Sequence, residues 1–191
     1  MMKYDATQRW PDMQADWDKD WHKMSHLYFW HTRAHYKSII PLLVGDVLDI
    51  GCGPGFLAAW TYPNEAHYTG IDISPEALTL AHTLFPAANF YQMDLSCQRA
   101  PISDGKFDTV VCAEVLEHLD THTFILSEIK RLAKMHARII LTVPVKMTGV
   151  GHVWPEWTTE DLTACGKEVG QVLSIRVDYE ENNMLAIVRR T

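Results

Sequence analysis

The stretch Val47–Gly55, which reads VLDIGCGPG, decides the fold of this chain. Its first four residues are apolar except for Asp49, a pattern typical of a strand buried inside a sheet. Glycines then occupy alternate positions, at Gly51, Gly53 and Gly55. Glycines at a strand end let the backbone turn tightly and approach a ligand closely. The stretch therefore predicts a strand, a ligand-binding turn and a helix that follows it.

Short apolar runs alternate with amphipathic segments along the rest of the chain. Further strands are predicted at His67–Ile71, Asn89–Gln92, Phe107–Cys112 and Arg138–Val143, and a closing hairpin at Val172–Tyr179 and Met184–Val188. Helices are predicted at Phe56–Tyr62, Pro75–Leu84, Thr121–Lys134 and Thr158–Val169, with N-caps at Ser74 and at Thr158 or Thr159. This order indicates an α/β fold with a mostly parallel sheet covered on both faces. Ligands are then expected at the carboxyl ends of the strands.

Composition and charge argue against several classes of protein. The chain has 191 residues and 47% hydrophobic residues, which indicates one globular domain. No apolar run approaches the ~18 residues of a membrane span, and Met1–Pro11 has no pattern of a secretory signal. A net charge of −7 disfavours nucleic acid as the main partner. The four cysteines form no C-x-x-C pair and indicate free thiols in the cytoplasm.

A second acidic residue strengthens the interpretation of the glycine-rich turn. Asp72 closes the next predicted strand, about 20 residues after Gly51, where a carboxylate can accept hydrogen bonds from a ribose diol. NAD enzymes share that pair of features. Their fingerprint, however, is G-x-G-x-x-G, and Phe56 stands where the third glycine or alanine belongs. The sequence therefore predicts a nucleoside ligand other than a dinucleotide.

Four segments in order resemble the class I S-adenosylmethionine-dependent methyltransferases. They are VLDIGCGPG, GIDIS, MDL and FDTVVCAEVLEHL, and the resemblance runs from Ile39 to about Val188. HLYFWHTRAHYKSIIPLL also looks like the front segment of some small-molecule members. The resemblance implies a Rossmann-like three-layer sandwich with a seven-stranded, mostly parallel sheet whose strand 7 is antiparallel. It further implies an N-terminal helical lid over residues 1–43, a core over residues 44–191, and S-adenosyl-L-methionine as cofactor.

The front segment also allows a simpler interpretation. A helix is predicted over Lys23–Ile40, ending at Pro41. The tryptophans of this segment would either anchor that helix to the sheet or form a lid over cofactor and acceptor. Both interpretations stay open at this stage.

The resemblance also implies which residues contact the cofactor. They are Asp49, Gly51, Cys52, Gly53, Gly55, Asp72, Ile73, Asp94, Leu95 and Ala113, with Trp30 and Arg33 from the front segment. Asp49 would lie near the amino group, Asp72 would take the ribose hydroxyls, and Ala113 would lie under the sulfonium. Asp94 with Leu95 would frame the adenine, although an aspartate after a strand is also typical of a plain turn.

The segment Glu114–His118, EVLEH, carries the candidate catalytic chemistry. His118 or Glu114 would act as a base if the acceptor must lose a proton. Glu114, Glu117 and His118 have helical spacing on one face, and with His152 they would form a divalent metal site. The alternative, which we favour, is that Glu117 and His118 cap a short helix without any metal.

The predicted function is methyl transfer to an oxygen or nitrogen of a small molecule. One alternative is a metal-dependent RNA 3′-terminal 2′-O-methyltransferase, suggested by EWT at Glu156–Thr158 after His152. Another is a methyltransferase-like module that binds cofactor without catalysis, which the intact glycine turn and Asp72 make less attractive. We expect a monomer or homodimer that acts on a small-molecule acceptor. Neither nucleic acid nor a membrane is expected as a partner.

Overall fold

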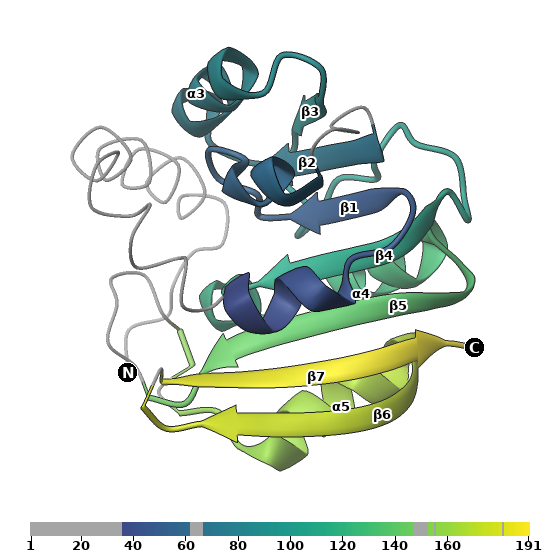
Figure 1. Ribbon diagram of the computed structural model, residues 1–191. Helices are drawn as coiled ribbons and strands as arrows, with labels where there is room; N and C mark the ends of the chain where they lie inside the picture. Colours follow the sequence, from purple (N-terminus) through teal and green to yellow (C-terminus); the bar gives the residue numbers. More distant parts are fainter. Residues whose placement is uncertain (1–35, 62–66, 147–152, 155, 181) are drawn as a thin grey trace.

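One sheet organises the molecule (Figure 1). The computed structural model describes residues 36–61, 67–146, 153–154, 156–180 and 182–191. In this part of the chain, seven strands lie in the order β3-β2-β1-β4-β5-β7-β6. They are β1 (Val47–Ile50), β2 (Tyr68–Asp72), β3 (Asn89–Gln92), β4 (Phe107–Ala113), β5 (Ala133–Pro144), β6 (Gly170–Asp178) and β7 (Asn183–Arg190).

The direction of the strands agrees with the prediction. Strands β1 to β5 pair in parallel, whereas β7 lies between β5 and β6 and is antiparallel to both. The mostly parallel seven-stranded sheet with an antiparallel strand 7 is therefore confirmed. Because β1, β2, β4 and β5 are parallel, their carboxyl ends meet at one edge of the sheet (Figure 1).

Helices cover both faces of this sheet and create three layers. The helical elements are α3 (Pro75–Leu84), α4 (Thr123–Leu132), α5 (Thr159–Val169) and the 3-10 turns η1 (Ile40–Leu42), η2 (Phe56–Thr61) and η4 (Leu116–His118). Helices α4 and α5 lie on one face, and the segment ending in η1 crosses the other (Figure 1). Neighbouring residues of β4 accordingly face different cores. Val110 packs in the α4–α5 cluster and Val111 in the η1–η2 cluster.

Local sequence signals fix the starts of two helices. Ser74 accepts a hydrogen bond from the Ala77 amide, and Pro75 fills the first turn of α3. Thr158, rather than Thr159, caps α5, and its hydroxyl and Asp161 form a reciprocal capping box. Such caps satisfy amides that have no partner inside the helix. Both predicted caps are thus confirmed.

Several predicted boundaries were wrong, by one or two residues in most strands and in the helix before β5, and by more at the start of β5 itself. The helix expected at Thr121–Lys134 is shorter at both ends, and β5 begins at Ala133 rather than at Arg138. The strand begins early because Ala133 pairs with Phe107 before the register shifts. The helix expected at Phe56–Tyr62 is the 3-10 turn η2.

The end of the front segment belongs to the core. Residues 36–39 are helical and continue into η1, and Ile39 is fully buried. The chain leaves η1 at Leu43, in extended conformation, two residues after Pro41. The remainder of the expected lid lies outside the described residues, so the lid and the division at residue 43 stay predictions. Among the described residues, no helix combines the length and apolar character needed to cross a membrane.

Candidate functional site

The glycine-rich turn after β1 needs its glycines. Gly51, Gly53 and Gly55 have φ of 71°, 52° and 73°, in the left-handed region that residues with a side chain rarely adopt. A Cβ on Gly51 would lie only 2.2 Å from Cγ2 of Val115. The amide of Gly51 donates to the Ile71 carbonyl at 2.8 Å, which ties the turn to β2.

Asp72 joins the ends of β1 and β2. Its Oδ2 accepts from the Gly53 amide at 2.7 Å, and its Oδ1 accepts from the Ser74 amide at 2.8 Å. A carboxylate offers about four acceptor positions, so these two amides are compatible with a ribose diol as a further donor. The structure therefore places the glycine turn and Asp72 next to each other at this edge of the sheet, as the sequence predicts.

Asp49 lies deeper than its neighbours. Its carboxyl is 3% exposed and accepts a short, 2.5 Å hydrogen bond from the Tyr68 hydroxyl. Burial raises the pKa of Asp49 to about 7, although the hydrogen bond from Tyr68 opposes this shift. Cys52 is also buried, and burial raises the pKa of its thiol well above the ordinary value. Sequence reasoning did not single out Tyr68, whose role depends on the pairing of β1 with β2.

Asp94 forms a turn, the simpler of its two interpretations. Its Oδ1 accepts from the amide and the hydroxyl of Ser96, at 2.9 and 2.6 Å. Its carbonyl accepts from the Gln98 amide at 2.8 Å. Leu95 is buried in the core, and Ile73 is partly buried after β2. A contact of Asp94 and Leu95 with adenine stays a prediction.

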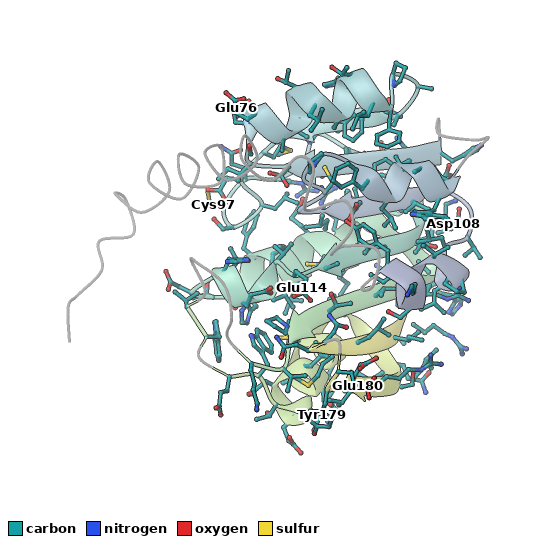
Figure 2. All side chains as sticks on the ribbon, turned by 60° about the vertical axis from the view of Figure 1, so that its left-hand side comes forward. Glu76, Cys97, Asp108, Glu114, Tyr179 and Glu180 are labelled. Atoms are coloured by element: carbon teal, nitrogen blue, oxygen red, sulfur yellow. The ribbon has the colours of Figure 1, made fainter. Side chains whose placement is uncertain are left out.

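Glu114 lies at the opposite side of the same edge, directly after Ala113 at the end of β4 (Figure 2). Its backbone is left-handed, with φ of 56°. Its Oε1 accepts from the Thr142 hydroxyl at 3.0 Å and from the Asn183 side-chain amide at 2.8 Å. Burial raises the pKa of Glu114 to about 7, against the effect of these hydrogen bonds. Such a pKa suits a proton acceptor that works near neutral pH.

Glu117 and His118 lie on η4, the short turn after Glu114. Glu117 is 1% exposed, and neither carboxyl oxygen has a hydrogen-bond partner among the described residues. Burial and the neighbouring charge of Glu114 raise the pKa of Glu117 well above its ordinary value. His118 is buried beside it, with Nε2 3.9 Å from Oε1 of Glu117, which is too long for a hydrogen bond.

The candidate metal site of Glu114, Glu117, His118 and His152 stays a prediction, because His152 is not among the described residues. Within the described ranges, no group of three or more His, Cys, Asp or Glu side chains is placed to hold a metal ion. Glu114 instead uses Oε1 for Thr142 and Asn183. His152, like Trp30 and Arg33, lies outside the described residues.

An aromatic cluster borders this side of the site. The rings of His122, Trp154 and Trp157 lie 5.1–5.4 Å apart, centroid to centroid. The indole of Trp154 donates to the Leu119 carbonyl at 2.8 Å and so fastens the segment after β5 to the end of η4. The sequence analysis named Trp157 only as part of EWT and did not identify the aromatic cluster. It also missed the contacts of Thr142 and Asn183 with Glu114, because these depend on strand pairing.

Comparison with known proteins decides the family. Residues 48–141 match the model of a methyltransferase domain, and that range runs from β1 into β5. The chain contains a methyltransferase domain of the class I S-adenosylmethionine-dependent family.

Curated relatives share part of their length with the chain. It is 32% identical over 133 residues to a ubiquinone biosynthesis O-methyltransferase of Paraburkholderia phytofirmans, covering 68% of the chain and 55% of the relative. It is 27% identical over 141 residues to the enzyme of that name in Photobacterium profundum, covering 72% and 58% respectively. The chain thus spans little more than half the length of these relatives.

A solved structure shares the fold. The 1,6-didemethyltoxoflavin-N1-methyltransferase of Burkholderia thailandensis, with 1,6-didemethyltoxoflavin and S-adenosylhomocysteine bound, has a TM-score of 0.73 at 16% identity. The similarity covers 100% of this chain and 93% of the other chain. At such low identity the likeness concerns the fold alone.

Proposed function

We propose that this chain transfers a methyl group from S-adenosyl-L-methionine to an oxygen or nitrogen of a small molecule. The observation that carries the proposal is the Asp72 carboxylate, which is held by the amides of Gly53 and Ser74 at the carboxyl ends of β1 and β2. A fixed carboxylate beside a glycine turn is suited to a ribose diol.

The described residues fit such a cofactor. The left-handed glycines carry no Cβ, so main-chain atoms of the turn can approach the methionine part closely. Asp72 would hold the ribose hydroxyls, Leu95 would border the adenine, and Ala113 would lie beside the sulfonium. Bound S-adenosylmethionine supplies an electrophilic methyl group. The protein therefore has to align the acceptor with it and exclude water, and alignment alone can lower the barrier substantially.

Glu114 is our candidate for the base that takes a proton from the acceptor. Thr142 and Asn183 hold its Oε1, and this orients the carboxyl group beside the end of β4. Burial holds the pKa of Glu114 at about 7, so a substantial fraction is ionised at neutral pH and can accept a proton. His118 is the second candidate, because it is buried on the neighbouring turn.

Several observations favour a small acceptor. Both relatives named above are O-methyltransferases of ubiquinone biosynthesis, and the solved structure named above holds a small heterocycle. The net charge of −7 gives little attraction for an RNA backbone. The RNA-terminal alternative also needs a metal ion shared by Glu114, Glu117, His118 and His152, and the described residues offer no three-ligand group for it.

A labelling experiment tests the proposal. The protein is incubated with methyl-labelled S-adenosylmethionine and with separate small-molecule, RNA and protein fractions of a cell extract. We expect label in the small-molecule fraction, and several-fold less there with Asp72→Ala when the cofactor concentration is below the wild-type Kd. Label in the RNA fraction would support the RNA-terminal alternative. Binding of S-adenosylhomocysteine without labelling of any fraction would support the non-catalytic module.

A further inference from the structure

A second hollow lies at the end of the sheet opposite to the candidate site. Its volume is about 360 Å³. The residues that line it come from the loop before β1 and from β4, β5, β6 and β7, and they are Val44, Asp108, Lys134, Met135, His136, Ala137, Arg138, Leu173, Val188 and Arg189. Asp108 and Glu114 mark the two ends of β4 (Figure 2). The hollow is therefore separate from the cofactor and acceptor side.

Two irregularities in neighbouring strands shape the hollow. Residues 134–137 of β5 bulge between Ala133, which pairs with Phe107, and Arg138, which pairs with Thr109. In β6, the register with β7 shifts between Val172 and Ser174, so Leu173 is not paired with a residue of β7. Bulges re-aim side chains and are common beside functional sites.

His136, within the first bulge, has an unfavourable backbone conformation. Its φ is 67°, in the region that glycine adopts without cost. A strained residue persists where the surrounding structure demands it, and such residues concentrate at sites of function. The side chain of His136 lines the hollow, which gives a reason for a histidine at a position that suits glycine.

Apolar side chains gather around the same hollow. Val44, Met135 and Leu173 are 49%, 59% and 47% exposed, and they are three of the six large apolar residues that are exposed in the described part of the chain. Scattered exposed apolar residues are ordinary, but a contiguous group marks a place of contact. The rim of the hollow is therefore suited to an apolar body.

Positive charge accompanies this apolar rim. Lys134 is neutralised locally, because its Nζ lies 2.7 Å from Oδ2 of Asp108. Arg138 donates one N–H to the Leu42 carbonyl, which leaves other donors of its guanidinium. Arg189 is exposed and makes no side-chain hydrogen bond or ion pair within the residues described. Asp46 also contacts Lys134, with its Oδ2 3.4 Å from Nζ, so Lys134, Arg138 and Arg189 exceed these two carboxylates by one positive charge.

We propose that this hollow binds a small organic anion that carries a phosphate or carboxylate group on an apolar body. Arg189 and Arg138 would bind the anionic group, and His136 would border it. Met135, Leu173 and Val44 would contact the apolar part. A volume of about 360 Å³ lies in the range of small-ligand pockets, ~300–1,000 Å³. The ligand is either a free metabolite or the headgroup end of an anionic lipid, since both present this chemistry.

Three probes test separately whether the anionic group and the apolar body of the proposed ligand contribute to binding. Hexyl phosphate carries both an anion and an apolar body, inorganic phosphate carries the anion alone, and hexanol carries the apolar body alone. In an NMR titration of the full chain, we expect hexyl phosphate to bind at least about tenfold more tightly than either partial probe. Its resonance shifts should lie at Met135, Arg189 and Leu173. Equal affinity for hexyl phosphate and inorganic phosphate would overturn the proposal.

Matched variants test the residues. Arg189→Glu and Met135→Ser should each weaken hexyl phosphate binding, by about tenfold for the charge reversal. Their controls are Arg176→Glu and Tyr179→Ser, which change exposed residues of the same kinds outside the hollow and should have no effect. Equal losses in variants and controls would overturn the proposal. Thermal melts of all four proteins establish that each is folded.

His136→Gly should stabilise the fold, so a loss of binding in this variant could not be attributed to unfolding. Glycine relieves the left-handed backbone, so the melting temperature should rise, while the affinity for hexyl phosphate should fall. Full retention of affinity would show that His136 is not part of a binding surface and would count against the proposal.

Vesicles distinguish the two sources of the ligand. Co-sedimentation with phosphatidylglycerol vesicles, lost in Arg189→Glu and absent with pure phosphatidylcholine, would identify a lipid headgroup. Binding of hexyl phosphate without vesicle binding would identify a free metabolite. A dimer that dissociates in Arg189→Glu, without any binding of hexyl phosphate, would show instead that the hollow contacts a second copy, and the proposal would be wrong.

Discussion

The two sides of the sheet's carboxyl edge are built in different ways. On the β1–β2 side, polar groups meet over short distances in sequence, as Asp72 does with Gly53 and Ser74. On the β4–β5–β7 side, Glu114 is held by Thr142 and Asn183, which lie 28 and 69 residues further along the chain. The first side can form from one βαβ unit. The second requires most of the sheet to be in place.

The two sides also differ in how their carboxyl groups are satisfied. Asp72 accepts hydrogen bonds from two main-chain amides, which fix its position for the recognition of a hydroxyl pair. Burial raises the pKa values of Glu114 and Glu117, and Glu117 has no partner for its oxygens among the described residues. Burial also raises the pKa of Asp49 on the β1 side to about 7, but that carboxyl accepts a hydrogen bond from the buried Tyr68 hydroxyl below the turn. Proton transfer from the acceptor is therefore expected at Glu114, on the β4 side.

The largest effect should follow from Glu114→Gln. The amide keeps the size of the side chain and can still accept from Thr142 and Asn183, but it cannot take a proton from the acceptor. We expect kcat to fall by about 10²- to 10⁴-fold, the usual contribution of a general base. Calorimetry with S-adenosylhomocysteine should show unchanged cofactor affinity.

The matched control for this variant is Glu160→Gln, which removes an exposed carboxylate at the start of α5. It should leave kcat and cofactor affinity unchanged. An unchanged kcat in Glu114→Gln would remove the difference between the two sides and would leave His118 as the candidate base.

Asp72→Ala should produce the next largest effect, on the other side of the edge. It removes the acceptor for the ribose hydroxyls and releases the amides of Gly53 and Ser74. Loss of a hydrogen bond to a charged group costs about 1.5–3 kcal/mol, so affinity for S-adenosylhomocysteine should fall at least about tenfold. Titration calorimetry measures it, and NAD should bind neither protein. Undiminished affinity would count against the role of Asp72.

Gly51→Ala and Gly105→Ala separate steric crowding from backbone strain. Both glycines are left-handed, with φ of 71° and 61°. A Cβ on Gly51 would collide with Val115, whereas a Cβ on Gly105 would meet nothing within 4 Å. Strain should cost both variants about 1–2 kcal/mol, and overpacking should cost Gly51→Ala about 1–3 kcal/mol more. Denaturant unfolding measures the difference, and equal losses would contradict the close contact with Val115.

The last prediction concerns the pH dependence of stability, where the change per pH unit is small. Burial raises the pKa values of Asp49 and Glu114 to about 7 in the folded chain, so the folded state binds more protons than the unfolded state below that pH. Their contribution to stability is complete below the unfolded pKa values and is lost as the pH rises towards 7. Each group should lower the free energy of unfolding by up to about 1.4 kcal/mol per pH unit.

Isosteric amides show which side carries this pH dependence. Asp49→Asn, on the β1 side, and Glu114→Gln, on the β4 side, should each flatten the decline in stability between about pH 5 and 7. Urea unfolding at four or five pH values gives the slopes. A wild-type stability that is constant over this range would show that neither carboxyl is protonated in the folded chain.

Sequence reasoning was strongest where neighbouring residues interact. The glycine turn, the cap at Ser74 and the position of Asp72 follow from local rules of backbone geometry, and the structure contains all three. The hydrogen-bonded turn at Asp94 was likewise one of two interpretations that the sequence allowed.

Local sequence rules could not predict contacts between residues that strand pairing brings together. Asn183 reaches Glu114 because β7 runs antiparallel beside β5, with Asn183 opposite Pro144. A turn signal at residues 181–183 predicted the hairpin but carried no information about that register. The early start of β5 was missed for the same reason, since it depends on the pairing of Ala133 with Phe107.

The position of β7 has a consequence for how the protein is made. Although β7 is the last strand in the chain, it lies inside the sheet, where it separates β6 from β5. During synthesis, β6 leaves the ribosome before the strand that it must pair with exists. Asn183 arrives with β7, so Glu114 acquires this partner only after β7 has been synthesised. A nascent or truncated chain that lacks residues 183–191 would present an open β5 edge to chaperones and proteases, so incomplete products would be recognised before they could act.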